Sequence, residues 1–189
     1  MFDKILANFA LHIHLDDNET AHVSAALAET QVKKNRVLLR AGEVCRNIYF
    51  VEEGCLRMYH TDNAGYDHTI LFAPENWWAV DIASFSHRKP AFYSLMALED
   101  TRLLYLSYPA LEALYKTVPK FERFFRILTQ NGFNMYQERI TSALSLTAEE
   151  RYTTFRKLYP GLETRIAQKH IASYIGITPV FLSRLRKRL

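Results

Sequence analysis

The hydrophobic period of residues 31–108 restricts the fold of this chain more than any other feature. Short runs rich in Val, Ile, Tyr and Phe recur there about every ten residues, among them NIYFVEEG, CLRMYHTD, YDHTILFAP and TRLLYLSY. Gly, Pro, Asn and Asp separate the runs. Glu53–Gly54 and the segment 62–65 predict hairpin turns because Gly and Asn tolerate positive φ. Many short strands at this spacing predict an antiparallel sandwich or barrel.

The segments on either side of this region follow a helical period. Apolar residues in the segment 1–30 are spaced by three and four positions, which predicts short helices before the strands. The order of strands and helices therefore predicts an α+β fold. A longer apolar stripe at the same spacing contains Phe121, Phe125, Leu128, Gly132, Tyr136, Ile140 and Leu144.

The long stripe predicts one helix over residues 120–144. At 1.5 Å per residue this helix would be about 36 Å long, which is more than a small β domain can cover. Gly132 costs about 1 kcal/mol of helix propensity, and we interpret it as a place where two backbones approach. The stripe either packs on the chain's own sheet or joins two copies of the chain. We favour a homodimer whose dimer helix presents Phe121, Phe125, Leu128, Gly132, Tyr136 and Ile140.

A domain boundary is predicted near Leu146. Thr147 is a candidate N-cap for a helix that begins at Ala148, and the sequence Tyr159–Pro160–Gly161 predicts the end of this helix. Residues 1–146 then form one domain, which includes the dimer helix, and residues 147–189 form a second domain.

The two predicted domains differ strongly in charge. The whole chain has 24 Lys and Arg, 20 Asp and Glu, and a formal net charge of +4. Residues 151–189 hold nine basic residues and one acidic residue, a net charge of +8, whereas residues 1–150 carry −4. This asymmetry predicts a polyanionic partner for the basic part. The alternative is a solvated helical face, which has the same composition.

The last 24 residues, IAQKHIASYIGITPVFLSRLRKRL, contain the most specific motif. Isoleucines predict the apolar side of a first helix, and Gly176 follows at the position where helices end in the left-handed conformation. Thr178 is a candidate N-cap, and Pro179 is suited to the first helical position, where a missing N–H costs nothing. A second helix with Leu182 and Leu185 on its inner side completes a helix-turn-helix.

The second helix has chemistry suited to double-stranded DNA. Its N-terminal residues can enter the major groove, where Arg184 would pair with guanine O6 and N7. Arg186, Lys187 and Arg188 would neutralise phosphate, which gives affinity rather than sequence choice. A helical hairpin with a solvated basic face is the alternative interpretation. The candidate DNA-binding residues are Gln168, Lys169, Thr178, Pro179, Val180, Phe181, Ser183, Arg184, Arg186, Lys187 and Arg188.

With these features the chain resembles the Crp–Fnr family of bacterial transcription regulators. The segment IYFVEEGCLRMYH (48–60) resembles the strand–Gly–strand hairpin of the family's cyclic-nucleotide-binding-like jelly roll, a double-stranded β-helix. The stripe at 120–144 resembles its central dimer helix, and IASYIGITP resembles the helix-turn-helix of a subgroup without an assigned effector. The resemblance implies an N-terminal antiparallel β jelly roll flanked by helices, a long central dimerisation helix and a C-terminal all-α helix-turn-helix domain.

The helix-turn-helix departs from the family pattern in two ways. The family continues into a β-hairpin wing, whereas this sequence ends at Leu189, so we expect a domain that lacks a full wing. The family's base-reading positions fall on Pro179, Val180 and Arg184, and only Arg184 is a residue type that reads guanine. Val180 and Phe181 are better suited to thymine methyl groups or sugar.

The residues that hold a cyclic nucleotide in the family are missing. Members that bind cyclic AMP use a Gly-Glu pair, then an Arg followed by Ser or Thr, and these positions are Val80–Asp81 and Ala91–Phe92 here. A buried phosphate would therefore lack its cation, and the nearby His87–Arg88–Lys89 is better interpreted as a solvated loop. Trp77 and Trp78 line a pocket or fill the core, and we favour the core. The candidate effector pocket consists of Trp77, Val80, Asp81, Arg88, Ala91 and Phe92.

Neither a cofactor nor a metal is expected. An iron–sulfur cluster needs four thiolates, and the chain has two cysteines, Cys45 and Cys55. An enzyme on a cupin-like jelly roll would need clustered His and a carboxylate on neighbouring strands, and the strand region has no such cluster. We therefore expect that the protein is not an enzyme.

The function that follows is a homodimeric, sequence-specific DNA-binding transcription regulator in a bacterial cytoplasm. The expected partners are double-stranded DNA, a second copy of the chain, RNA polymerase and an unknown small-molecule effector. No apolar run is long enough for a membrane helix, so no membrane partner is expected. The alternative is a small-molecule sensor or cupin-like protein whose basic tail binds a non-DNA partner, such as a protein or RNA.

Overall fold

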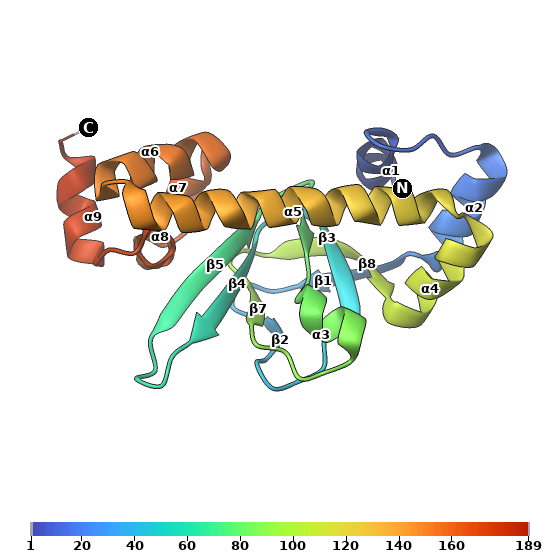
Figure 1. Ribbon diagram of the computed structural model, residues 1–189, viewed down its shortest axis with the longest axis horizontal. Helices are drawn as coiled ribbons and strands as arrows, with labels where there is room; N and C mark the ends of the chain where they lie inside the picture. The colour runs from blue at the N-terminus through green and yellow to red at the C-terminus, as the bar shows by residue number, and fades with distance from the viewer. Residues whose placement is uncertain (1, 189) are drawn as a thin grey trace.

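The computed structural model describes residues 2–188, so Met1 and Leu189, the outer ends of the two predicted domains, lie outside the described residues. A capping box begins the second helix, because the Asp16 carboxylate accepts the Glu19 N–H while the Glu19 carboxylate accepts the Asp16 N–H. The short helices predicted before the strands are therefore present. They are α1 (Asp3–Ala10) and α2 (Asp17–Ala26) (Figure 1).

The strands form two antiparallel sheets, as the jelly-roll resemblance implies. They are β1 (Ala28–Val32), β2 (Val37–Leu39), β3 (Asn47–Glu53), β4 (Leu56–Thr61), β5 (Asp67–Ala73), β6 (Trp78–Ala79), β7 (Ser94–Ala97) and β8 (Thr101–Ser107). One four-stranded sheet has the order β1-β8-β3-β6, and the other has the order β2-β7-β4-β5. The strand β5 is therefore an edge strand, and the long helix passes close to it.

One of the two predicted hairpin turns is wrong. Gly54 joins β3 to β4, but these strands belong to different sheets, so the turn carries the chain from one sheet to the other. Its φ is +93°, and a Cβ at this position would lie 2.6 Å from Thr101 Oγ1, so only glycine fits. The other predicted turn is a hairpin between β4 and β5, in which the Asp62 carboxylate accepts the N–H groups of Ala64 and Tyr66.

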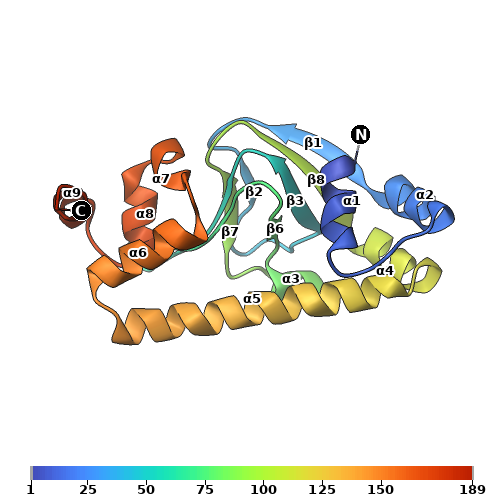
Figure 2. The same cartoon turned by 90° about the horizontal axis from the view of Figure 1, so that it is seen from above.

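The long helix extends across the whole molecule (Figure 1). It is α5 (Lys120–Ser145), and it follows α3 (Ile82–His87) and α4 (Tyr108–Thr117) in the chain. The bounds of α5 match the predicted 120–144, and at 1.5 Å per residue the helix is about 39 Å long. Viewed from above, α5 forms one edge of the molecule, and both sheets lie on the same side of this helix (Figure 2).

A first hydrophobic core fills the space between the sheets and the helices of the N-terminal part. Phe121, Phe124 and Phe125 of α5 are buried in it, so Phe121 and Phe125, which were predicted to face a second copy of the chain, pack within the protomer instead. The Phe124 ring centroid lies 4.9 Å from that of Phe9 and 5.9 Å from that of Trp78. Trp78 is therefore a core residue, as favoured from the sequence.

The C-terminal part is helical and packs on the jelly roll. Its helices are α6 (Ala148–Leu158), α7 (Leu162–Arg165), α8 (Gln168–Ile175) and α9 (Pro179–Arg186). Thr147 caps α6 as predicted, through a capping box with Glu150. A second hydrophobic core joins these helices to Cys55, Phe72 and Leu98 of the jelly roll. Within residues 2–188, no helix is both long enough and apolar enough to cross a membrane.

Candidate nucleic-acid interface

The turn between α8 and α9 has the conformation that the sequence predicts. Gly176 is left-handed with a φ of 72°, and the Ile177 N–H donates to the Ala172 carbonyl at 3.0 Å. Thr178 Oγ1 accepts the Phe181 N–H at 3.2 Å, and Pro179 is the first residue of α9. The two helices and their turn therefore form a helix-turn-helix.

The inner side of α9 belongs to the second core. Leu182 is fully buried and Leu185 is nearly so, and both pack in the core that contains Ile171 and Ile175 of α8. This is the inner side that the sequence predicts for the second helix.

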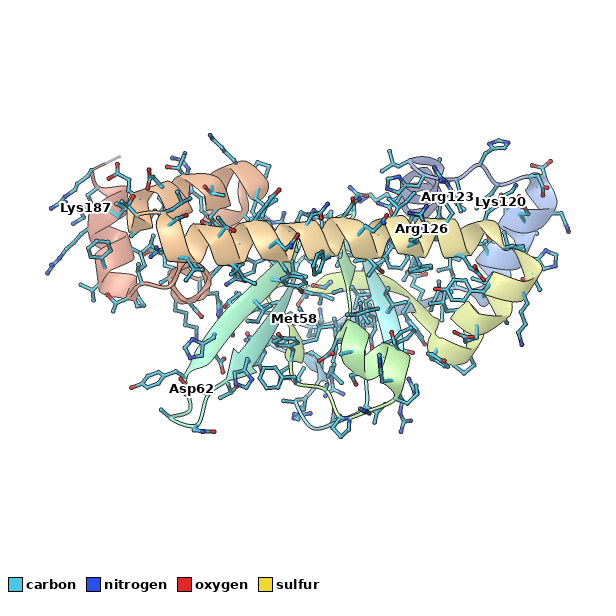
Figure 3. The ribbon with its side chains drawn as sticks, in the orientation of Figure 1. Met58, Asp62, Lys120, Arg123, Arg126 and Lys187 are labelled. Carbon is cyan, nitrogen blue, oxygen red and sulfur yellow. The ribbon has the colours of Figure 1, made fainter. Side chains whose placement is uncertain are left out.

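The outer side of α9 is exposed and basic. Val180 is 63% exposed and Phe181 is 47% exposed, and Lys187 projects away from the molecule (Figure 3). Among residues 2–188, neither Arg184 nor Lys187 forms an ion pair with a carboxylate. Of the candidate DNA-binding residues, Arg186 is half-buried, and the exposed ones are Gln168, Lys169, Thr178, Pro179, Val180, Phe181, Ser183, Arg184, Lys187 and Arg188.

The helix α8 docks on the edge strand β5. Ser173 Oγ accepts the Thr69 N–H at 2.8 Å and donates to the Asp67 carbonyl at 2.6 Å. These bonds satisfy backbone groups that an edge strand leaves without a partner. Sequence reasoning did not identify this contact, because a serine inside a helix gives no sign of which strand it will meet.

Arg139 joins the long helix to both β5 and α8. Its guanidinium donates to the carbonyl oxygens of Thr69, Ile70 and Tyr174, and it lies 4.0 Å from the centre of the Tyr174 ring. Burial lowers the pKa of Arg139 below its ordinary value, although a guanidinium stays charged in proteins. The only sequence signal for this role is that Arg139 lies directly before Ile140 of the apolar stripe.

A second buried arginine lies under α8. Arg57 is 2% exposed, and it donates to Thr69 Oγ1 at 2.8 Å and to the Asp67 carboxylate at 3.0 Å. His170 in the first turn of α8 is half-buried nearby. Burial, with the positive charges of Arg57 and Lys169, lowers the pKa of His170 to about 4. His170 is therefore neutral at pH 7.

Asp81 and Arg88 of the candidate effector pocket are engaged in contacts within the protein. One Asp81 carboxylate oxygen accepts the Ser84 N–H, which caps α3, and the other accepts the N–H groups of Phe92 and Tyr93. Arg88 donates to the Cys45 carbonyl at 2.8 Å and lies over the Tyr108 ring. Neither side chain is free to hold a ligand in this conformation.

The other candidate pocket residues are dispersed. Ala91 is buried, whereas Phe92 is 60% exposed and stacks on His60 with 4.2 Å between ring centroids. Trp77 and Val80 line a cavity of about 640 Å³ between α5 and the jelly roll. The walls of this cavity are mostly apolar, and none of its lining residues is Lys or Arg. Trp77 is half-buried and also packs against Tyr159 in the second core, with 5.3 Å between ring centroids.

The cysteines lie in apolar surroundings. Cys45 and Cys55 are both buried and free, and burial raises the pKa of both thiols. In the part of the chain that the structure describes, no three His, Cys, Asp or Glu side chains gather in a way that could hold a metal ion.

Comparison with known proteins relates the chain to bacterial regulators. A family model described as "Cyclic nucleotide-binding domain" matches residues 29–118. The "Fumarate and nitrate reduction regulatory protein" of Vibrio cholerae is 27% identical, over 98% of this chain and 78% of its own length. The "Anaerobic regulatory protein" of Pasteurella multocida is 26% identical over 84% of this chain, and the match spans only 61% of that protein.

Solved structures give the same fold. FixK2 from Bradyrhizobium japonicum has a TM-score of 0.74 at 18% identity, over 86% of this chain and 84% of the FixK2 chain. The curated relatives are regulatory proteins and not enzymes, which agrees with the class of protein expected from the sequence.

Proposed function

We propose that the chain is a transcription regulator of the Crp–Fnr family, which the comparisons support, and that it is a homodimer that binds a two-fold symmetric site in double-stranded DNA. The outer side of α9 carries this proposal, because it is exposed, basic and capped at its N-terminal end. A helix of this kind fits the major groove of DNA. The protein would act in the cytoplasm, with RNA polymerase as a further partner at its promoters.

The exposed basic residues divide between two roles in this proposal. Arg184 lies in the last turn of α9, and its guanidinium would pair with guanine O6 and N7. Lys187 and Arg188 directly follow α9 and would contact phosphate, and Gln168 and Lys169 would contact the DNA backbone from the first turn of α8. Affinity would then fall steeply with salt because each phosphate contact releases counterions.

Selection from random duplexes tests the DNA proposal. We expect a preferred two-fold symmetric site, and we expect Arg184→Ala to relax the preference at one position at a cost of about 1–3 kcal/mol. The matched variant Lys187→Ala should weaken binding to all duplexes equally and reduce the slope of log K against log salt by about one. Equal binding to all duplexes after selection would contradict the proposal.

The second half of α5 supports the homodimer. Phe133, Ile140 and Leu144 are 61%, 60% and 83% exposed, and their spacing of seven and four places them on one side of the helix. At Gly132 a Cβ would meet no atom within 4 Å, so the backbone there is open to a partner. A second copy of α5 would cover these side chains and the adjoining apolar cavity. Dimerisation along α5 would place two α9 helices for half-sites about 34 Å apart.

Sedimentation analysis of variants that introduce charge on α5 tests the homodimer. Ile140→Glu combined with Leu144→Glu should give a folded monomer, because two buried carboxylates would have no partner in the interface. Ser145→Glu, which lies about 100° around α5 from Leu144 and outside this apolar side, is the matched control and should stay dimeric. A double variant that remains a dimer would place the interface elsewhere.

We also propose that the jelly roll does not bind a cyclic nucleotide. Asp81 and Arg88 are held by contacts within the protein, and the cavity near Trp77 offers no cation to a phosphate. Calorimetry with cyclic AMP and cyclic GMP should show no binding heat. Saturable micromolar binding of either nucleotide would contradict this proposal. The chemistry of the cavity favours a neutral small-molecule effector.

A further inference from the structure

The first turn of α9 exposes two adjacent apolar side chains. Val180 and Phe181 are the only large hydrophobic side chains that are strongly exposed in residues 147–188. The same helix buries its other apolar residues, Leu182 and Leu185, in the second core. Apart from Pro179, the other outward residues of α9 are polar or basic, and the pair is exposed in the protomer.

The first turn offers almost no hydrogen-bond donor for a base. Pro179 has no N–H, and the Thr178 hydroxyl, which accepts the Phe181 N–H as the helix cap, keeps a single O–H donor. The next side chain that can donate two hydrogen bonds is Arg184. It shares one side of α9 with Val180 and Phe181, at spacings of four and three.

The basic residues around Val180 and Phe181 indicate which kind of partner covers these two side chains. The basic residues of α9 favour a polyanion, and the one apolar group on the base edges of the major groove is the thymine C5-methyl. RNA does not offer this group, because uracil lacks the methyl and the major groove of an RNA helix is too narrow for side chains. An apolar pair on a basic helix therefore fits thymine-containing duplex DNA.

We propose that Val180 and Phe181 recognise thymine methyl groups in each half-site, next to a guanine contacted by Arg184. Four residues of helix rise about 6 Å, and neighbouring base pairs are 3.4 Å apart, so the thymines lie within about two steps of the guanine. This inference rests on the proposed DNA binding and adds the sequence chemistry of the half-site.

Replacement of thymine by deoxyuridine tests the inference, because it removes only the methyl group. The full chain would be titrated with its selected site and with copies in which single thymines near the guanine are replaced. Loss of one buried methyl should weaken binding about three- to fivefold. Replacement of thymines outside the half-sites should change nothing.

Matched variants assign the effect to the two side chains. Val180→Ala and Phe181→Ala should bind the thymine and deoxyuridine sites almost equally, whereas Lys187→Ala should be weaker on both and keep the full thymine preference. Both apolar side chains are exposed, so their replacement leaves the second core intact, and circular dichroism checks this.

The outcomes separate this inference from the proposed function. Sequence-specific binding that does not change with deoxyuridine would overturn the inference and leave the DNA proposal standing. Selected half-sites without thymine would do the same. A chain that shows no sequence-specific duplex binding would overturn both.

Discussion

The two hydrophobic cores differ in where their residues come from. The first core is built from the inside of the jelly roll and the helices that directly precede and follow it. The second core takes residues from the segment 152–185 and adds Cys55, Phe72 and Leu98 from strands and loops far away in sequence. The first core therefore stabilises one domain, whereas the second fixes the helix-turn-helix to the jelly roll and couples the position of α9 to β5.

Removal of a ring from the first core should have the largest effect on stability. Phe124 is fully buried between Phe9, Trp78 and Phe125. We expect Phe124→Ala to lower the free energy of unfolding by about 3–5 kcal/mol, because the ring leaves a cavity that its neighbours only partly fill. Urea unfolding followed by circular dichroism measures this loss.

The matched variant in the second core is Phe72→Ala. Phe72 is also fully buried, and its ring centroid lies 5.6 Å from that of Tyr159 and 5.4 Å from that of Tyr174. Here we expect release of the helix-turn-helix before the jelly roll unfolds, seen as protease cleavage near Leu146. A single unfolding transition shared by both variants would mean that the two cores form one cooperative unit.

Local sequence patterns predicted the elements of both cores. The stripe at 120–144 is α5, and the Gly176–Thr178–Pro179 pattern is the turn of the helix-turn-helix, because caps and helical periods depend on neighbours in sequence. The Gly54 turn was predicted as a hairpin, since its sequence fixes the backbone conformation and not the sheet to which the next strand goes.

The contacts between distant segments could not be predicted in this way. Arg139, Ser173 and Arg57 act together only because the chain brings α5, α8 and β4 to the strand β5. Asp81 is a candidate effector-pocket residue in the sequence, but its carboxylate is held by backbone N–H groups up to 12 residues away. The division into domains near Leu146 and the roles of the DNA-contacting side chains stay predictions.

Loss of the Arg139 guanidinium should weaken the attachment of the second core. Arg139→Met keeps the length of the side chain but leaves the carbonyl oxygens of Thr69, Ile70 and Tyr174 without their donor. We expect a loss of about 2 kcal/mol or more, because charged hydrogen bonds at buried sites contribute strongly. Protease cleavage near Leu146 should become faster.

The control for this variant is Arg139→Lys, which keeps the charge but not the planar fork. Arg139→Lys should restore only part of the resistance to protease, because an ammonium cannot donate to the three carbonyl oxygens in the same geometry. If the Met variant resists protease as well as the native chain does, Arg139 is not a link between the two parts.

Mild acid should separate the two parts through His170. Its pKa is lowered to about 4 in the docked chain by burial and by the charges of Arg57 and Lys169, whereas Asp67 raises it and Lys34 lowers it. A freely exposed histidine titrates near 6.5. Between pH 6.5 and pH 4, His170 is therefore protonated in the undocked state but neutral in the docked state. Docking of the helix-turn-helix on the jelly roll weakens as the pH falls through this window, and it has its full strength above pH 6.5.

Cleavage near Leu146, measured against pH, should rise over this window in the native chain. In His170→Gln the rise should disappear, because glutamine has no titrating group. An unchanged pH profile in the variant would assign the acid effect to the carboxylates.

The smallest effect is expected from the exposed ion pairs that join α7 to the jelly roll. Arg165 contacts Glu75 at 2.7 Å and Glu99 at 2.9 Å, and its side chain is 35% exposed. Hydrogen bonds to Glu75 and then Glu99 raise the pKa of Arg165, yet solvent screens such a network. We expect Arg165→Ala to weaken docking by about 1 kcal/mol or less.

The control is Arg156→Ala, because Arg156 pairs with Glu163 inside the helical part and does not reach the jelly roll. The two variants should have similar free energies of unfolding, but only Arg165→Ala should speed protease cleavage near Leu146. Salt at about 1 M should remove this difference in cleavage rate. If the difference persists at high salt, Arg165 contributes through the packing of its methylene groups on the second core. The docking of the helix-turn-helix would then depend on apolar contact and on Arg139 rather than on surface charge.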